Sequence, residues 1–132
     1  MQMRIRESLI YLIVAASVAP SPAHAGSCRV QLANYAPDNS TAQKVMSSLE
    51  AGIAASQHLV LADQAFNLEF RLIDAHFDNA GYPGSERLRV FYVLTGPRGA
   101  FISASVLTCQ SDAASCVEPA EFRLLEVCKL HA

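Results

Sequence analysis

Four cysteines constrain this chain more than any other feature of its 132 residues. They are Cys28, Cys109, Cys116 and Cys128. Neither a C-x-x-C motif nor a zinc-finger spacing of cysteine and histidine occurs, so disulfide bonds are favoured over a metal or redox site. This interpretation requires export of the chain, because disulfides persist in oxidising compartments and are rare in the cytosol.

The first 25 residues indicate export. A start containing Arg4 and Arg6 is followed by an apolar run from Leu9 to Val18 and by the tripeptide Ala23-His24-Ala25. These are the three parts of a secretory signal peptide. The apolar run is about 10 residues long, whereas a membrane-spanning helix needs roughly 20. We therefore predict a signal peptide over residues 1–25, cleaved after Ala25, and a product that is periplasmic or secreted.

A lipid anchor is the alternative reading of the same region. The segment Ala25-Gly26-Ser27-Cys28 loosely resembles a bacterial lipobox, in which the cysteine carries the lipid. The large aliphatic residue usual three places before that cysteine is Ala25 here, and the apolar core already ends at Val18. Lipidation of Cys28 is therefore not expected, and an unmodified Cys28 completes an even set of cysteines.

Four cysteines allow three pairings, and the sequence leaves all three open. The small polar segment between Cys109 and Cys116 suits a short closed loop, which would leave Cys28 to pair with Cys128. On chain-entropy estimates the short loop is worth about 2.5 kcal/mol and the long one about 4.7 kcal/mol. We favour this pairing, with both bonds as structural crosslinks.

Length limits the remaining segment, 26–132, to one domain. The whole chain carries a net charge of −2, which excludes a strongly basic nucleic-acid-binding protein. No second stretch is long and apolar enough to span a bilayer, and no repeat or interdomain linker occurs. We expect a single domain with neither a nucleic-acid partner nor a membrane span.

The clearest helix signal follows the segment Pro37-Asp38-Asn39, which ends the first predicted strand. Ser40-Thr41-Ala42-Gln43 matches a capping box, in which the Ser40 hydroxyl accepts a free backbone N–H and the Gln43 side chain reaches back. Apolar residues then recur at the spacing of one helix face: Ala42, Val45, Met46, Leu49 and Ile53. The pattern predicts an amphipathic helix over about 41–56.

Period-2 alternation, which is typical of half-buried strands, recurs along the chain. It predicts strands over 29–33, 66–77 and 100–109, and the short apolar segment 58–61 and the largely apolar segment 87–95 predict two more. The alternation changes parity at Leu72-Ile73, where a β-bulge is expected. The last two strands flank a tight turn and predict a hairpin.

Two further segments complete the predicted fold. The second half of 87–95 is apolar on both sides, which favours a central strand with packing on both faces. Segment 119–130 fits a helix or a strand, and we favour the helix. The fold class is α+β: a mostly antiparallel sheet of about five strands, one main amphipathic helix and a possible C-terminal helix, stapled by disulfides.

This order of elements resembles a group of bacterial envelope domains. The strand Arg29–Ala33, the break at Asn39-Ser40, the helix, the segment Leu59–Asp63 and the Thr95-Gly96 turn are similar to the N-terminal domain of TolB and to related domains of LpoB and CsgG. The resemblance covers residues 28–108 and rests on pattern and turn placement, while the four cysteines depart from it. It implies a non-catalytic envelope adaptor and assigns no site residue.

Asp74, His76 and Asp78 form the sharpest candidate for chemistry. On a strand they share one face at intervals of about 6.6 Å, so their donor atoms could converge on a zinc or calcium ion. The same groups could serve a metal-dependent or acid–base enzyme, or simply line a solvated face. Hydrolase motifs and a glycine-rich phosphate loop are absent from the sequence, so we assign no catalytic residue and no cofactor.

The loop 78–86 is a candidate binding element. Tyr82, Pro83 and Gly84 offer an aromatic anchor in a turn, and Arg87 follows. Such a loop could enter the cleft of a target, as in a secreted inhibitor or immunity-type protein. The reading that fits the whole sequence best is a small exported, non-catalytic domain that binds a protein or a cell-envelope component.

Overall fold

The computed structural model describes residues 27–79, 81, 84 and 86–131. The expected signal peptide, residues 1–25, lies outside the described residues and stays a prediction. The elements in chain order are β1 (Cys28–Asn34), α3 (Ser40–Ala54), β2 (Leu59–Leu61), β3 (Leu68–Asp78), β4 (Arg87–Thr95), β5 (Phe101–Cys109), the short 3₁₀ helix η1 (Ala113–Cys116) and α4 (Val117–His131). The predicted α+β class is confirmed, and the ambiguous C-terminal segment is a helix.

Five strands form one sheet in the order β2-β1-β3-β4-β5. The β3-β4 and β4-β5 pairs are antiparallel, but β1 runs parallel to both β2 and β3, so the sheet is partly parallel. The parallel pairs arise because α3 carries the chain back to the starting end of β1 before β2 begins. Segment 62–67 then crosses β1, since Leu61 and Leu68 lie on either side of Val30.

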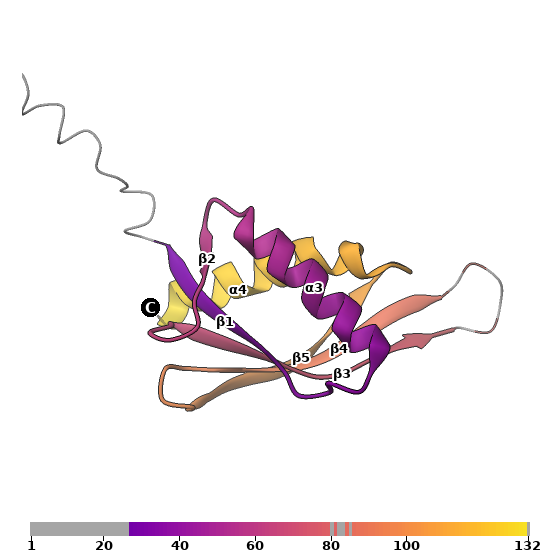
Figure 1. Cartoon of the computed structure of the whole chain (residues 1–132), viewed down its shortest axis with the longest axis horizontal. Coiled ribbons are helices and arrows are strands. Elements are labelled where there is room, and N and C mark those ends of the chain that lie inside the picture. Colours follow the sequence, from indigo (N-terminus) through magenta and orange to yellow (C-terminus); the bar gives the residue numbers. More distant parts are fainter. Residues whose placement is uncertain (1–26, 80, 82–83, 85, 132) are drawn as a thin grey trace, which may run out of the picture.

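Both helices lie on one face of the sheet, which we call the inner face (Figure 1). Alternate strand residues point into this layer and are buried there, including the stacked rings of Phe70 and Tyr92, whose centroids are 4.9 Å apart. From the helices come Val45, Leu49, Ile53, Leu124 and Val127. The core therefore has two layers, with helices above and sheet below.

The expectation that 87–95 is the central strand, packed on both faces, is wrong. β3 occupies the middle of the strand order, and β4 lies second from the edge. Its residues Leu88, Val90, Tyr92 and Leu94 are buried beneath the helices, whereas no described helix covers the opposite side. The apolar residues on that side make a different structural feature, the outer face, considered below.

The predicted change of parity is confirmed. The pairing between β3 and β4 shifts between Leu72 and Asp74, which leaves Ile73 as the extra residue of a bulge. Leu72 and Ala75 are both buried although they are three residues apart, so the bulge lets apolar side chains on both sides of Ile73 point into the core. One inserted residue thus keeps the whole length of β3 in register with the core.

Helix α3 begins one residue earlier than predicted, with a different cap. The cap is Asn39, whose Oδ1 accepts hydrogen bonds from the backbone N–H groups of Thr41 and Ala42. The Asn39 Nδ2 group donates to the Ala75 carbonyl at 2.9 Å and to Asp74 Oδ1 at 3.2 Å. The Ser40 capping box was wrong because Asn39 can cap the helix and hold β3 at the same time.

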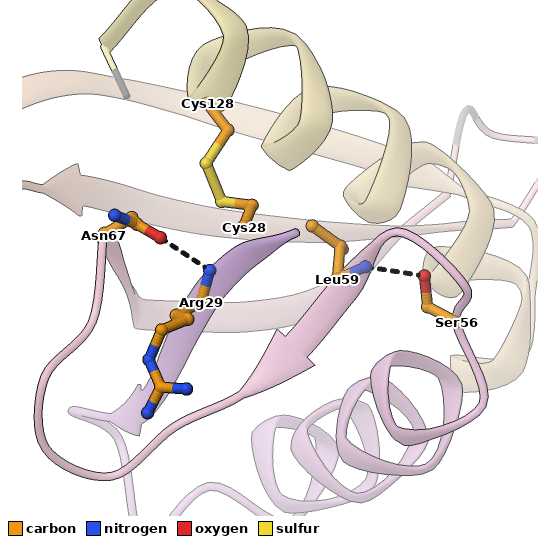
Figure 2. Close-up of a disulfide and its surroundings, with 6 residues drawn as sticks. All are labelled: Cys28, Arg29, Ser56, Leu59, Asn67 and Cys128. Carbon is orange, nitrogen blue, oxygen red and sulfur yellow. Dashed lines mark hydrogen bonds between the residues drawn. A yellow bond between two sulfur atoms is a disulfide. The ribbon is translucent and has the colours of Figure 1, made fainter. Parts of the chain in front are cut away.

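Two disulfides close the structure, with the pairing favoured from the sequence. Cys28 in β1 is bonded to Cys128 in α4, over 100 residues of chain (Figure 2). Cys109 at the end of β5 is bonded to Cys116 at the end of η1, over seven residues. The first bond ties the first strand to the last helix, and the second fixes the turn that leads into that helix.

Loss of the two disulfides is expected to destabilise the fold unequally. Replacing Cys28 and Cys128 by alanine lowers the free energy of unfolding by about 4.7 kcal/mol, and replacing Cys109 and Cys116 lowers it by about 2.5 kcal/mol, because the longer loop restricts the unfolded chain more. Urea denaturation of the two double variants measures both values. A larger loss from the shorter loop would contradict this account.

The cap of α3 gives a second test. Asn39→Ala is expected to lower the free energy of unfolding by about 1–2 kcal/mol, because the first turn loses its acceptor. Asn39→Ser keeps an acceptor for the first turn but loses the donor to β3, so its effect is intermediate. Ser40→Ala is the matched control and should stay within about 0.5 kcal/mol of the wild type in urea denaturation. If Ser40→Ala lowered the free energy of unfolding equally, Ser40 and not Asn39 would be the capping residue.

Candidate functional site

The outer face of the sheet carries a band of apolar side chains that no described helix covers. We call it the outer apolar band; its members are Tyr35, Ile73, Phe91, Val93, Ala104 and Val106. Cross-strand register aligns them, since Phe91 lies beside Asp74 on one side and Val106 on the other, and Val93 lies beside Ala104. The band therefore runs across neighbouring strands instead of along one.

Exposure distinguishes this band from a buried core. Tyr35 is 54% exposed, Ile73 42% and Val106 38%. Phe91 and Val93 between them are half-buried by their neighbours. Isolated apolar side chains on a surface need no explanation, but a contiguous group is typical of an interaction site.

An ordered ion pair borders the band. Arg71 Nε lies 2.7 Å from Glu69 Oε1, and the Arg71 guanidinium lies 5.4 Å from the centre of the Tyr35 ring. The side-chain hydrogen bond from Arg71 to Glu69 raises the pKa of the arginine above its ordinary value. Thr95 Oγ1 also donates to Glu69 Oε1, at 3.3 Å. The charged border is thus held in place by the sheet itself.

The three predicted metal ligands do lie on the outer face, where Asp74 and His76 contact each other and Asp78 contacts an arginine. His76 Nδ1 lies 3.3 Å from Asp74 Oδ2, and the His76 ring stacks on Phe91 at 5.4 Å. Asp78 Oδ2 lies 3.1 Å from Arg89 Nε. No group of three or more His, Cys, Asp or Glu positioned for a metal ion occurs within the described part of the chain. Metal binding at this face stays a prediction.

The predicted binding loop is described only in part. Tyr82 and Pro83 lie outside the described residues. Gly84 has a φ of +80°, a backbone conformation that glycine adopts without strain. Arg87 is exposed at the start of β4 and donates to the Glu86 carbonyl at 3.0 Å. The role of this loop stays a prediction.

A groove lies between α4 and the edge strand β5. Its volume is about 510 Å³, and its lining residues are Tyr92, Val106, Leu107, Glu118, Pro119, Phe122, Arg123 and Glu126. Phe122 is 67% exposed. The sequence did not single out this groove, because it arises only when the helix predicted over 119–130 lies beside β5 and Phe122 lines the groove together with Val106 and Leu107.

A second hollow lies beside the start of β1. Arg29 Nε donates to the Ala65 carbonyl at 2.6 Å, and the Asn67 side chain accepts from the Arg29 backbone N–H at 2.8 Å (Figure 2). The hollow of about 600 Å³ also contains Gln31, Asp63 and Pro97. These polar contacts secure the crossing segment 62–67 on β1, which accounts for the arginine structurally.

Comparison with known proteins supports the fold and not a family. Neither a protein-family model nor a curated protein matches the chain. A solved structure of a minor lipoprotein from Acinetobacter baumannii is similar, with a TM-score of 0.51, 12% sequence identity, and coverage of 77% of this chain and 91% of that chain. The resemblance to TolB, LpoB and CsgG domains stays a prediction.

Two observations bear on membrane attachment. Among the described helices, none combines the length and apolarity needed to cross a bilayer. The Cys28 sulfur, which a lipid anchor would require, is bonded to Cys128.

Metal titration tests the Asp74–His76–Asp78 hypothesis. We expect zinc or calcium added to chelator-treated protein to leave Tm unchanged, because Asp78 pairs with Arg89 and Asp74 with Asn39. Differential scanning calorimetry measures the shift. A rise in Tm that His76→Ala abolishes would establish the metal site instead.

Proposed function

We propose that this chain is an exported domain of the cell envelope that binds a protein partner through the outer apolar band and catalyses no reaction. The observation that carries the proposal is the band itself, an apolar group on a sheet face that none of the described elements covers. Sheets normally bury their apolar face against another layer. A partner protein would supply the missing one.

The two disulfides support the exported location. All four cysteines of the chain are paired, and such bonds persist in the periplasm and outside the cell. The similarity to a minor lipoprotein agrees with an envelope role, although it extends to the fold alone. Whether the protein is periplasmic or fully secreted follows from where its partner lies.

The border of the band supports a protein partner of mixed character. Protein interfaces combine an apolar centre with a polar rim, and aromatic and arginine side chains are enriched in them. Here Tyr35, Phe91 and Arg71 have those roles, with the Arg71–Glu69 and Arg89–Asp78 pairs at the margins. Because these charges are already paired, a partner need not neutralise them.

Charge placed in the band is expected to weaken partner binding. Ile73→Lys and Tyr35→Lys should each reduce capture of envelope proteins from a membrane extract at least tenfold, since burial of an unpaired lysine costs more than about 1.4 kcal/mol. Quantitative mass spectrometry of proteins captured by the oxidised chain measures the loss. Leu130→Lys is the matched control, because Leu130 is exposed on α4 and lies outside the band.

Two results would contradict the proposal. One is equal capture by the wild type, both band variants and the control. The other is an enzymatic activity of the purified protein that His76→Ala removes, which would favour the acid–base alternative. Circular dichroism and intact-mass analysis of each variant ensure that a loss reflects the surface and not unfolding or reduction.

A further inference from the structure

The two edges of the sheet differ in how well they are protected from another strand. β2 forms one edge and is only three residues long. β5 forms the other edge and runs for nine residues, FISASVLTC, without a charge or a proline. Exposed edges are usually blunted by shortness, charge or proline, because unpaired N–H and C=O groups otherwise pair with a second chain.

The side of β5 that faces away from β4 pairs with no other described strand, although Cys109 at its end is bonded to Cys116 in η1. Within the described residues, no backbone hydrogen bond joins its outer side to a loop or helix. The register shift of its pairing with β4 is confined to the turn end, near Ile102, and leaves Ser103–Cys109 regular. β5 thus presents a regular, uncharged row of donors and acceptors.

We propose that this edge binds a second copy of the chain, with the two β5 strands antiparallel about a two-fold axis near Ser105. A two-fold contact is isologous, so a strand must be compatible with itself in reverse. In this register Ala104 lies beside Val106 of the second copy, and Ser103 beside its Leu107. No like charges meet, because β5 contains no charge.

The ends of the strand favour a second copy over an unrelated peptide. In an antiparallel pair the first end of one β5 lies at the last end of the other, so Arg98, in the turn before β5, and Asp112, in the turn after it, come to the same end of the contact. Both residues are exposed, and neither belongs to an ion pair within the described part of the chain. The two-fold axis generates this complementary contact twice.

The groove beside β5 fits the same arrangement. Val106 and Leu107 line it from the strand, and the exposed Phe122 lines it from α4. A strand added at this edge would lie next to Phe122 and cover apolar surface that is now open. On the opposite side, the outer apolar bands of the two copies would become continuous through Val106 and Ala104.

Sedimentation equilibrium of the oxidised protein tests the proposal. The wild type is expected to be dimeric. Val106→Lys is expected to be monomeric, because the lysine of each copy would lie against apolar residues of the other β5 and close to the second lysine. Leu61→Lys is the matched control: Leu61 is also 38% exposed and lies on the opposite edge strand, so its dimer should be unchanged.

A charge exchange tests the antiparallel orientation of the two strands and does not depend on core stability. Arg98→Asp and Asp112→Arg are each expected to weaken the dimer about tenfold, because each turns two attractive contacts into repulsive ones. The double variant restores the attraction, and its dissociation constant should return to within about threefold of the wild type. Both positions are exposed, so the variants are expected to fold.

Several outcomes would overturn the proposal. A wild type that remains monomeric at millimolar concentration leaves no two-fold contact of useful strength. A dimer that survives Val106→Lys would place the contact elsewhere. The same conclusion would follow if the double charge variant did not restore the affinity that the single variants lose. An extended peptide that binds β5 of a monomeric protein makes the occupant another chain. This test uses β5 and its flanks, whereas the band test uses Ile73 and Tyr35, so either proposal can fail alone.

Discussion

The disulfide between Cys28 and Cys128 joins the two ends of the described fold, and the other packing depends on it. β1 pairs with both β2 and β3, so a constraint on its first residue acts on three strands. Through Cys128 the same bond holds α4, whose Leu124 and Val127 close the core. A core of this size is thin on its own, because small domains bury a limited share of their surface. Such a bond persists in an oxidising compartment, which agrees with a location outside the cytoplasm.

Because both helices lie on the inner face of the sheet, the apolar side chains of the outer face stay at the surface. α3 contacts α4 closely at Gly52, where a side chain would collide with Val117. The two helices together cover the inner face, and no described element remains for the outer one. Apolar side chains on β3, β4 and β5 then become surface, and the bulge at Ile73 adds one more to them. The same step that builds the core creates the candidate interface.

The uneven edges follow from the topology in the same way. The chain leaves β2 after three residues to cross β1, and the Arg29 contacts with the crossing segment keep that edge short. β5 enters as the second strand of a hairpin, whose length is set by β4 and not by any need to protect an edge. The sheet therefore has one short edge strand, β2, and one long uncharged edge strand, β5. The β5 edge adjoins the α4 groove, so the two features form one region.

Local chemistry in the sequence determined a great deal about this protein: the α3 amphipathic pattern, the parity change at Leu72-Ile73, the β4-β5 hairpin and the favoured cysteine pairing. These are decided by neighbours in the chain or by loop length, which the sequence displays directly. Only the tertiary structure decided that β1 is parallel to its neighbours, that Asn39 rather than Ser40 caps α3, and that the second apolar side of β4 is surface. Each of these depends on residues distant in sequence: the crossover through α3, the Ala75 carbonyl that Asn39 holds, and the two helices sharing one face. Alternation along a strand shows whether its two sides differ in polarity, but it does not show which layer of the structure lies against each side.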